Sequence, residues 1–167
     1  LVSGPVALTP PSGLVEFVPV VSAADMADAV RARFGACDAA IFCAAVADYR
    51  PAHPAKSKIK KREGALVLEL ERTEDILASC GMRKREDQIL VGFAAETDDL
   101  EENAMRKLVR KNADWIVAND VAKTDRGFAG DDNAATLFAR DGRRIELPLQ
   151  SKTTLARAIL QTVLSHS

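Results

Sequence analysis

The chain has 167 residues, of which 47% are hydrophobic and 28% are charged, and its formal net charge is −1. A chain of this length can bury a full hydrophobic core, so we expect one domain over residues 1–167. The near-neutral charge argues against a nucleic-acid binder, because binding to a phosphate backbone needs clustered positive charge. No stretch approaches the ~20 apolar residues of a membrane span, and no signal peptide is visible.

Three cysteines occur in the chain, at Cys37, Cys43 and Cys80. An odd and sparse set without paired spacing predicts neither a disulfide framework nor a zinc site. Such a set is typical of a reducing compartment. We therefore expect a cytoplasmic protein that has no membrane partner.

Short apolar or β-branched runs alternate along the chain with segments of helical spacing. Helices are predicted after the capping residues Ser22, Thr73, Thr97 and Ser151. The continuous apolar run 39–45 is typical of a strand that is covered on both faces. The predicted strands are 14–20, 39–45, 66–70, 89–95, 115–118, 136–139 and 144–147.

Local signals mark the ends of several elements. Asp25 lies three residues after Ser22, a spacing that predicts a capping box at the start of the first helix. Gly35 suits the position that follows this helix. Asp141 and Gly142 lie between two short strands and predict a type I′ hairpin turn, which needs positive φ at both central residues.

The alternation of strands and helices predicts the fold class α/β. Strands separated by helices pair in parallel and carry helices on both faces of the sheet. We expect a three-layer α/β/α arrangement around a mostly parallel, Rossmann-like sheet. The last two strands should add an antiparallel hairpin at the C-terminal end.

Three segments should lie at the carboxyl ends of the strands, where ligands bind in open α/β sheets. They are 43–50, 92–97 and 118–121. Each leaves a strand with small residues, which let a ligand approach the backbone, and then offers polar side chains. The sequence therefore predicts a ligand site at this edge.

Two groups of lysines add positive charge. The loop Lys58–Lys61 is either a solvated basic loop or a clamp that closes over phosphate groups. Lys107 and Lys111 lie one turn apart on one helix face. They either interact favourably with the helix dipole or bind an anionic ligand.

Other polar residues leave alternatives open. Asp48 either orients a ligand or serves as a cap or as a partner of Arg50. Cys43 lies in an apolar run and is interpreted as a core residue rather than a nucleophile. The segment 131–133 is interpreted as a turn in preference to a cation site. The chain lacks the glycine-rich dinucleotide and Walker-type phosphate loops.

Taken in order, several segments resemble the phosphopantothenoylcysteine synthetase family, which in bacteria is commonly the C-terminal half of a bifunctional protein. The resemblance covers nearly the whole chain. The segments that carry it are 2–5, 44–49, 58–61, 92–97, 107–112, 118–121, 127–128 and 132–134.

The resemblance implies a homodimer that ligates 4′-phosphopantothenate to L-cysteine in two steps. The substrate carboxylate attacks the α-phosphate of CTP in the presence of Mg²⁺, and the cysteine amine then displaces CMP from the acyl-cytidylate. FMN is implied only if the full-length protein also carries a phosphopantothenoylcysteine decarboxylase domain. Residues that match the family's motifs take roles by the same resemblance.

The implied catalytic residue is Lys58, which would hold phosphate and assist the second step. Ala45 and Asp48 are implied to contact the substrate. The family usually has Asn-Pro-Asp-Ile where this chain has 73–76, so the backbone geometry there is expected to differ. The implied nucleotide-binding residues are Phe42, Cys43, Ala44, Asp48, Lys58, Glu74, Asp75, Ile76, Leu77, Phe93, Lys107 and Lys111.

Two features conflict with a simple transfer of these roles. The C-terminal end of a helix lies at the opposite edge of the sheet from the strand ends, so Lys107 and Lys111 should be distant from the site. We expect a broken or displaced helix, or lysines that serve a neighbouring subunit. The family's N-terminal βα unit is also missing, so 1–167 is expected to be a truncated synthetase domain.

Two other functions compete with a ligase. The same pocket would also suit a non-catalytic nucleotide-binding module. An NAD(P)-dependent oxidoreductase domain would share the fold class, but the missing glycine fingerprint counts against it.

Overall fold

The computed structural model describes residues 1–55, 57–61, 63–96, 99–120 and 132–165. Its central sheet has five strands in the order β3-β6-β7-β8-β9. The first three strands are parallel, and β8 and β9 are antiparallel to their neighbours. The strands are β3 (Ala39–Phe42), β6 (Ile89–Glu96), β7 (Trp115–Asp120), β8 (Asp132–Ala139) and β9 (Arg144–Ser151).

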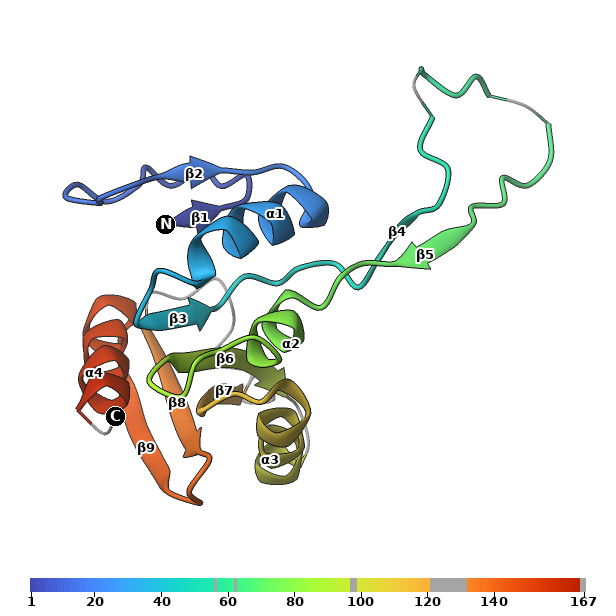
Figure 1. The fold of residues 1–167 in the computed structure, drawn as a ribbon. Coiled ribbons are helices and arrows are strands. Elements are labelled where there is room, and N and C mark those ends of the chain that lie inside the picture. The colour runs from blue at the N-terminus through green and yellow to red at the C-terminus, as the bar shows by residue number, and fades with distance from the viewer. Residues whose placement is uncertain (56, 62, 97–98, 121–131, 166–167) are drawn as a thin grey trace.

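Helices cover both faces of this sheet (Figure 1). One hydrophobic cluster joins one face to α1 (Ala23–Phe34), α2 (Ile76–Gly81) and α3 (Leu100–Lys111). A second cluster joins the other face to α4 (Lys152–Leu164). Successive residues of β6 and β7 alternate between the two clusters, as side chains of a strand must. The predicted α/β/α fold class is confirmed.

Two small ribbons lie outside the central sheet. In the first, β1 (Val2–Ser3) and β2 (Val18–Pro19) pair in parallel. In the second, β4 (Tyr49–Pro51) and β5 (Leu70–Arg72) pair antiparallel. We call β4, β5 and their connection the arm, which spans 49–72. The arm projects away from the rest of the chain (Figure 1).

The predicted helix caps are confirmed at two places. Ser22 and Asp25 form a reciprocal capping box at the start of α1. Ser151 accepts a hydrogen bond from the backbone of Thr154 at the start of α4. Caps are local interactions, so their residues can be recognised without knowledge of the tertiary structure.

Several predicted boundaries are wrong. The strand expected over 14–20 is reduced to β2, and the strand expected over 66–70 begins only at Leu70. The cap of α2 is Asp75 rather than Thr73, because the Asp75 carboxylate accepts from the backbone of Ala78 at 3.0 Å. The Thr73 hydroxyl instead donates to the carbonyl of Ala47 at 2.5 Å.

The two glycine-based predictions also need correction. Gly35 follows α1 but has a helical φ of −64°, so its conformational freedom is not used. At the hairpin, Gly142 has φ +89° whereas Asp141 is not among the residues with positive φ. The four-residue connection 140–143 is therefore not a type I′ turn, which requires positive φ at both central positions.

The strand predicted over 39–45 is shorter and less covered than expected. β3 ends at Phe42 and lies at the edge of the five-stranded sheet. Ile41 is 39% exposed and Cys43 is exposed, so the interpretation of Cys43 as a core residue is wrong. An edge strand lacks a neighbour on one side, which an apolar run in sequence does not reveal. The predicted cap Thr97 and the first residue of 131–133 lie outside the described residues. Asp132 and Asn133 lie in β8 and pair with β9, so the interpretation of this segment as a turn is wrong for them.

Candidate functional site

A cavity of about 290 Å³ lies on the face of the sheet that carries α1, α2 and α3. The segment after β3, the turn that enters α2 and the last turns of α3 meet around it. Its lining residues are Met26, Phe42, Ala44, Val46, Ala47, Asp48, Thr73, Glu74, Asp75, Ile76, Leu77, Phe93, Lys107, Arg110 and Lys111.

The cavity depends on close packing of α2 against β6. Gly92 lies in β6, and a Cβ atom there would come within 2.6 Å of a Leu77 methyl and 3.0 Å of an Ile116 methyl. The absence of a side chain at Gly92 therefore lets Leu77 pack directly on the strand. The turn that precedes α2 is thereby held at the rim of the cavity.

Lys111 is the principal buried charge of this site. Its side chain is 9% exposed, and its ammonium forms an ion pair with the Asp75 carboxylate. Asp75 also caps α2, so one carboxylate joins the start of α2 to the end of α3. Burial lowers the pKa of the Lys111 ammonium, and the nearby charge of Asp48 acts in the opposite direction.

Lys107 reaches the same cavity one turn earlier on α3. Its ammonium donates to the carbonyl oxygen of Phe93 at 3.2 Å. Both lysines therefore line a cavity in their own chain, and α3 is one continuous helix. The expectation of a broken helix is therefore wrong. The alternative that these lysines serve a neighbouring subunit stays a prediction. Helical side chains lean toward the N-terminus, and the cavity extends along the sheet face rather than beyond the strand ends.

Arg110 is a lining residue that the sequence interpretation missed. It lies three residues after Lys107, so the helical periodicity that singled out Lys107 and Lys111 also includes it. It has no ion-pair partner among the residues that the structure describes. Glu74, on the opposite wall, is paired with Arg31 at 2.6 Å. The α3 wall therefore carries three cations, of which Lys111 is paired with Asp75.

Three predicted site residues are not brought to this cavity. Ala45 is not among its lining residues. Cys43 lines a separate apolar cavity of about 330 Å³ together with Ile41 and Leu155 of α4. Lys58 is exposed and lies in the arm, which projects from the body of the chain (Figure 1).

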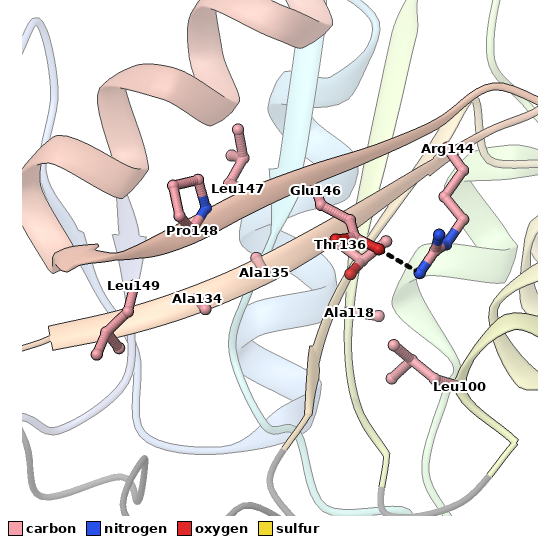
Figure 2. Close-up of a pocket in the computed structure, with 10 residues that line it drawn as sticks. All are labelled: Leu100, Ala118, Ala134, Ala135, Thr136, Arg144, Glu146, Leu147, Pro148 and Leu149. Carbon is pink, nitrogen blue, oxygen red and sulfur yellow. Dashed lines mark ion pairs between the residues drawn. The ribbon is translucent and has the colours of Figure 1, made fainter.

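A larger cavity of about 470 Å³ lies over β8 and β9 beside the start of α3. Figure 2 shows that its wall is formed mainly by small and aliphatic side chains. Its charged residues Arg144 and Glu146 form an ion pair with each other at 2.6 Å. Because it contains no predicted site residue and its charges are neutralised, the cavity beside Lys107 and Lys111 is the better candidate.

The described residues contain no group of three or more His, Cys, Asp or Glu side chains placed to hold a metal ion. They also contain no helix both long and apolar enough to cross a bilayer. Cys80 is buried, and its burial raises the pKa of its thiol to about 11. Neither Cys80 nor the exposed Cys43 lines the cavity, so its chemistry rests on the lysines, Arg110 and the carboxylates.

Comparison with known proteins identifies similar chains. Residues 1–166 match the family described as the DNA/pantothenate metabolism flavoprotein C-terminal domain. A relative from Bacillus subtilis (strain 168), the coenzyme A biosynthesis bifunctional protein CoaBC, is 51% identical over the whole chain. The chain spans only 41% of the length of that relative.

Solved structures are similar as well. The crystal structure of the C-terminal domain of coenzyme A biosynthesis bifunctional protein CoaBC is 45% identical, with a TM-score of 0.77. The match covers 97% of this chain and 70% of that one. A Cab2 mutant in complex with phosphopantothenate-cysteine is 16% identical over 90% of this chain and 54% of its own, with a TM-score of 0.60, and so shares the fold alone.

Proposed function

Because this chain belongs to the family of DNA/pantothenate metabolism flavoprotein C-terminal domains, we propose that it is the synthetase part of a phosphopantothenate–cysteine ligase. The observation that carries the proposal is the convergence of Lys107, Arg110 and Lys111 on one cavity between β3, α2 and β6. Three cations beside an apolar floor suit a nucleoside triphosphate. The names of the relatives support the placement of this reaction in coenzyme A biosynthesis.

In the first step, the carboxylate of 4′-phosphopantothenate attacks the α-phosphorus of CTP. A P–O bond forms, the bond to pyrophosphate breaks, and an acyl-cytidylate results. Lys107, Arg110 and Lys111 neutralise the triphosphate charge so that two anions can approach each other. Phe42, Phe93 and the segment 74–77 would line the nucleotide.

In the second step, the amine of L-cysteine attacks the acyl carbon and the bond to CMP breaks. The amine loses a proton as the amide forms, and CMP leaves as an anion. Ala45 and Asp48 are assigned to the substrate, and Lys58 is the proposed catalytic residue of this step. Charge neutralisation and alignment carry the reaction, so a strong base is not required.

The donor set of the cavity fits Mg²⁺ bound through the triphosphate. Mg²⁺ is commonly held by one or two carboxylates, with phosphate oxygens and water completing its shell. Asp48 lines the cavity, whereas Asp75 is already engaged by Lys111 and Glu74 by Arg31. Asp48 is therefore the residue that would hold the ion, which would supply further charge neutralisation when bound.

The position and the exposed surface of the arm favour a second subunit. Lys58 lies on the arm, away from the cavity of its own chain. Exposed apolar side chains on the arm include Leu66, Val67 and Leu68, which are 67%, 88% and 59% exposed. Such a surface is typical of an interface. We therefore propose a homodimer in which the arm carries Lys58 to the cavity of the partner.

The proposal also concerns the cellular compartment, the nucleotide and the cofactor of the full-length protein. The free cysteines favour the reducing cytoplasm. CTP is the proposed nucleotide. FMN would belong only to a decarboxylase domain elsewhere in the full-length protein, in line with the word bifunctional in the name of the relative.

The test is an assay of the complete protein with CTP, Mg²⁺, 4′-phosphopantothenate and L-cysteine. Pyrophosphate and CMP should be released in equal amounts, and pyrophosphate alone should appear when cysteine is omitted. Lys111→Met should raise the KM for CTP roughly 10- to 100-fold, the loss expected for one charged hydrogen bond. Arg106→Met is the matched control, because Arg106 is exposed on the same helix and does not line the cavity.

Other outcomes would select the competing functions. Tight CTP binding without pyrophosphate release would identify a non-catalytic nucleotide-binding module. Binding of NADPH in place of CTP would identify an oxidoreductase domain. Either result contradicts the ligase.

A further inference from the structure

We infer that Gly81, Asn112 and Arg140 form a clamp that positions the ammonium of Lys111 in the cavity. None of the three lines the cavity. The clamp joins the end of α2, the end of α3 and the connection between β8 and β9. The inference rests on the proposed function for its effect on CTP, but the geometry of the clamp can be tested separately.

The first contact of the clamp is between backbones. A Cβ atom at Gly81 would overlap the carbonyl oxygen of Lys111 and lie 2.9 Å from its carbonyl carbon. It would also come within 3.1 Å of the Asn112 Cβ. Only glycine allows the end of α2 to approach the end of α3 this closely. The backbone of Lys111 is thereby held against the last residue of α2.

The second contact is the Asn112 side chain. Its Nδ2 donates to the Gly81 carbonyl oxygen at 2.6 Å, and its Oδ1 accepts from Arg140 at 2.5 Å. The backbone N–H of Arg140 donates to the Asp114 carbonyl at 2.9 Å. This bond holds the backbone of Arg140 in place, so that its guanidinium can reach Asn112. Both ends of the amide are therefore occupied, and the amide bridges α2 to the hairpin connection.

Asn112 also ends α3 in the left-handed conformation, with φ 50° and ψ 37°. Glycine would serve this backbone equally well or better. Glycine would not supply the amide that bonds Gly81 and Arg140. The Asn112 amide therefore links α2 to Arg140, a role that the termination of α3 alone does not require.

The clamp determines where the Lys111 side chain can go. Its backbone is held at Gly81, the last residue of α2, while its ammonium pairs with Asp75, the cap of α2. The lysine stem therefore runs along α2 from one end to the other. Lys107 is held differently, through the Phe93 carbonyl. Loss of the clamp should displace Lys111 and leave Lys107 in place.

The first experiment measures the geometry without any nucleotide. In the complete protein, trace labelling with acetic anhydride and mass spectrometry give the reactivity of Lys111 relative to Lys107. We expect Lys111 to be protected in the wild type and several-fold more reactive in Asn112→Gly and Asn112→Asp. Both variants tolerate the left-handed backbone but lack the donor to Gly81. Unchanged protection in both variants would overturn the clamp, whatever reaction the protein catalyses.

The second experiment asks whether the clamp acts through Lys111. Asn112→Gly should raise the KM for CTP about tenfold, as expected for a displaced binding group, and leave the KM for cysteine unchanged. The same substitution in a Lys111→Met background should produce no further rise. An equal rise in both backgrounds would show a general loss of structure and overturn the inference. Absence of CTP turnover in the wild type would contradict the proposed function and leave the labelling result standing.

A pair of arginine variants completes the test. Arg140→Gln removes the guanidinium that holds the Asn112 amide and should reproduce part of the Asn112→Gly effect. Arg143→Gln removes a guanidinium from the same connection, where Arg143 pairs with Asp141 and not with Asn112. It should leave the labelling of Lys111 unchanged. Equal effects of the two variants would contradict the role of Arg140.

Discussion

Lys111 combines features that rarely occur together in a residue with a purely structural role. It is buried and charged, and it lies beside the carboxylates Asp75 and Asp48. Taking an ammonium out of water is unfavourable, and the ion pair with Asp75 offsets part of this loss. Perturbed lysines of this kind gather at functional sites. A triphosphate would replace the carboxylates as the partner of the ammonium.

The dependence of CTP binding on alkaline pH should reflect the deprotonation of the Lys111 ammonium. Its pKa is lowered from the ordinary 10.5 by burial. A lysine with a lowered pKa is charged below that pKa and becomes neutral as the pH rises through it, earlier than an exposed lysine would. The KM for CTP should therefore rise at a lower pH than expected from ordinary lysines. Steady-state measurements between pH 7 and pH 10 check this, and the same rise in Lys111→Met would contradict the assignment.

Residue identity alone predicted part of this site. The spacing of Lys107 and Lys111 placed them on one helix face, and the structure places both in one cavity. Cys43 was misplaced because the face on which a residue lies depends on where its strand ends. Arg110 was missed although it shares the same helical face.

At the scale of elements, the contact between α2 and α3 shapes the cavity. The two helices meet where Gly81 lies against the carbonyl of Lys111. α2 has six residues and is too short to be stable by itself. Its position therefore depends on packing and on its cap, Asp75.

Gly81→Ala should lower the free energy of unfolding by about 2–3 kcal/mol, because the new methyl group meets backbone that cannot rotate away. Gly35→Ala is the matched control. Gly35 has helical φ and ψ with nothing within 4 Å of the added carbon, so alanine should be neutral or stabilising by about 0.5 kcal/mol. Urea denaturation followed by circular dichroism measures both. Equal values for the two variants would show that the close approach is not a constraint.

The sequence predicted the elements better than their ends. The capping box of α1, the alternation of strands with helices and the amphipathic last helix depend on residues close in sequence, and they are confirmed. The end of β3 and the start of β5 depend on the presence or absence of a neighbouring strand. The strand propensity of a segment carries no information about whether another strand lies beside it.

At the scale of the whole molecule, the arm separates Lys58 from the cavity of its own chain (Figure 1). Arms that exchange between subunits complete sites in trans. In the proposed two-fold dimer, each cavity would receive one arm from its partner. The apolar side chains of the arm would then be covered in the dimer.

Subunit complementation tests this arrangement. At a CTP concentration well below the wild-type KM, Lys58→Ala and Lys111→Met should each retain little activity as homodimers. After mixing and refolding, half of the dimers are mixed, and each contains one cavity with both lysines intact. Activity should then recover to about a quarter of the wild-type value. Absence of recovery, with mixed dimers confirmed by mass spectrometry, would place Lys58 in the cavity of its own chain instead.

The sequence by itself determined the α/β alternation, the caps of α1 and α4, the shared face of Lys107 and Lys111, and the family to which the motifs belong. These properties depend on periodicity and on neighbours within a few residues. Only the tertiary structure decided that the Lys111 side chain runs along α2 to Asp75, that Cys43 lies in another cavity, and that Lys58 lies on a projecting arm. Each of these depends on how distant segments pack. The close approach of α2 to α3 at Gly81, and the lack of a neighbouring strand beyond β3, are set by the arrangement of elements and not by the sequence of any single element.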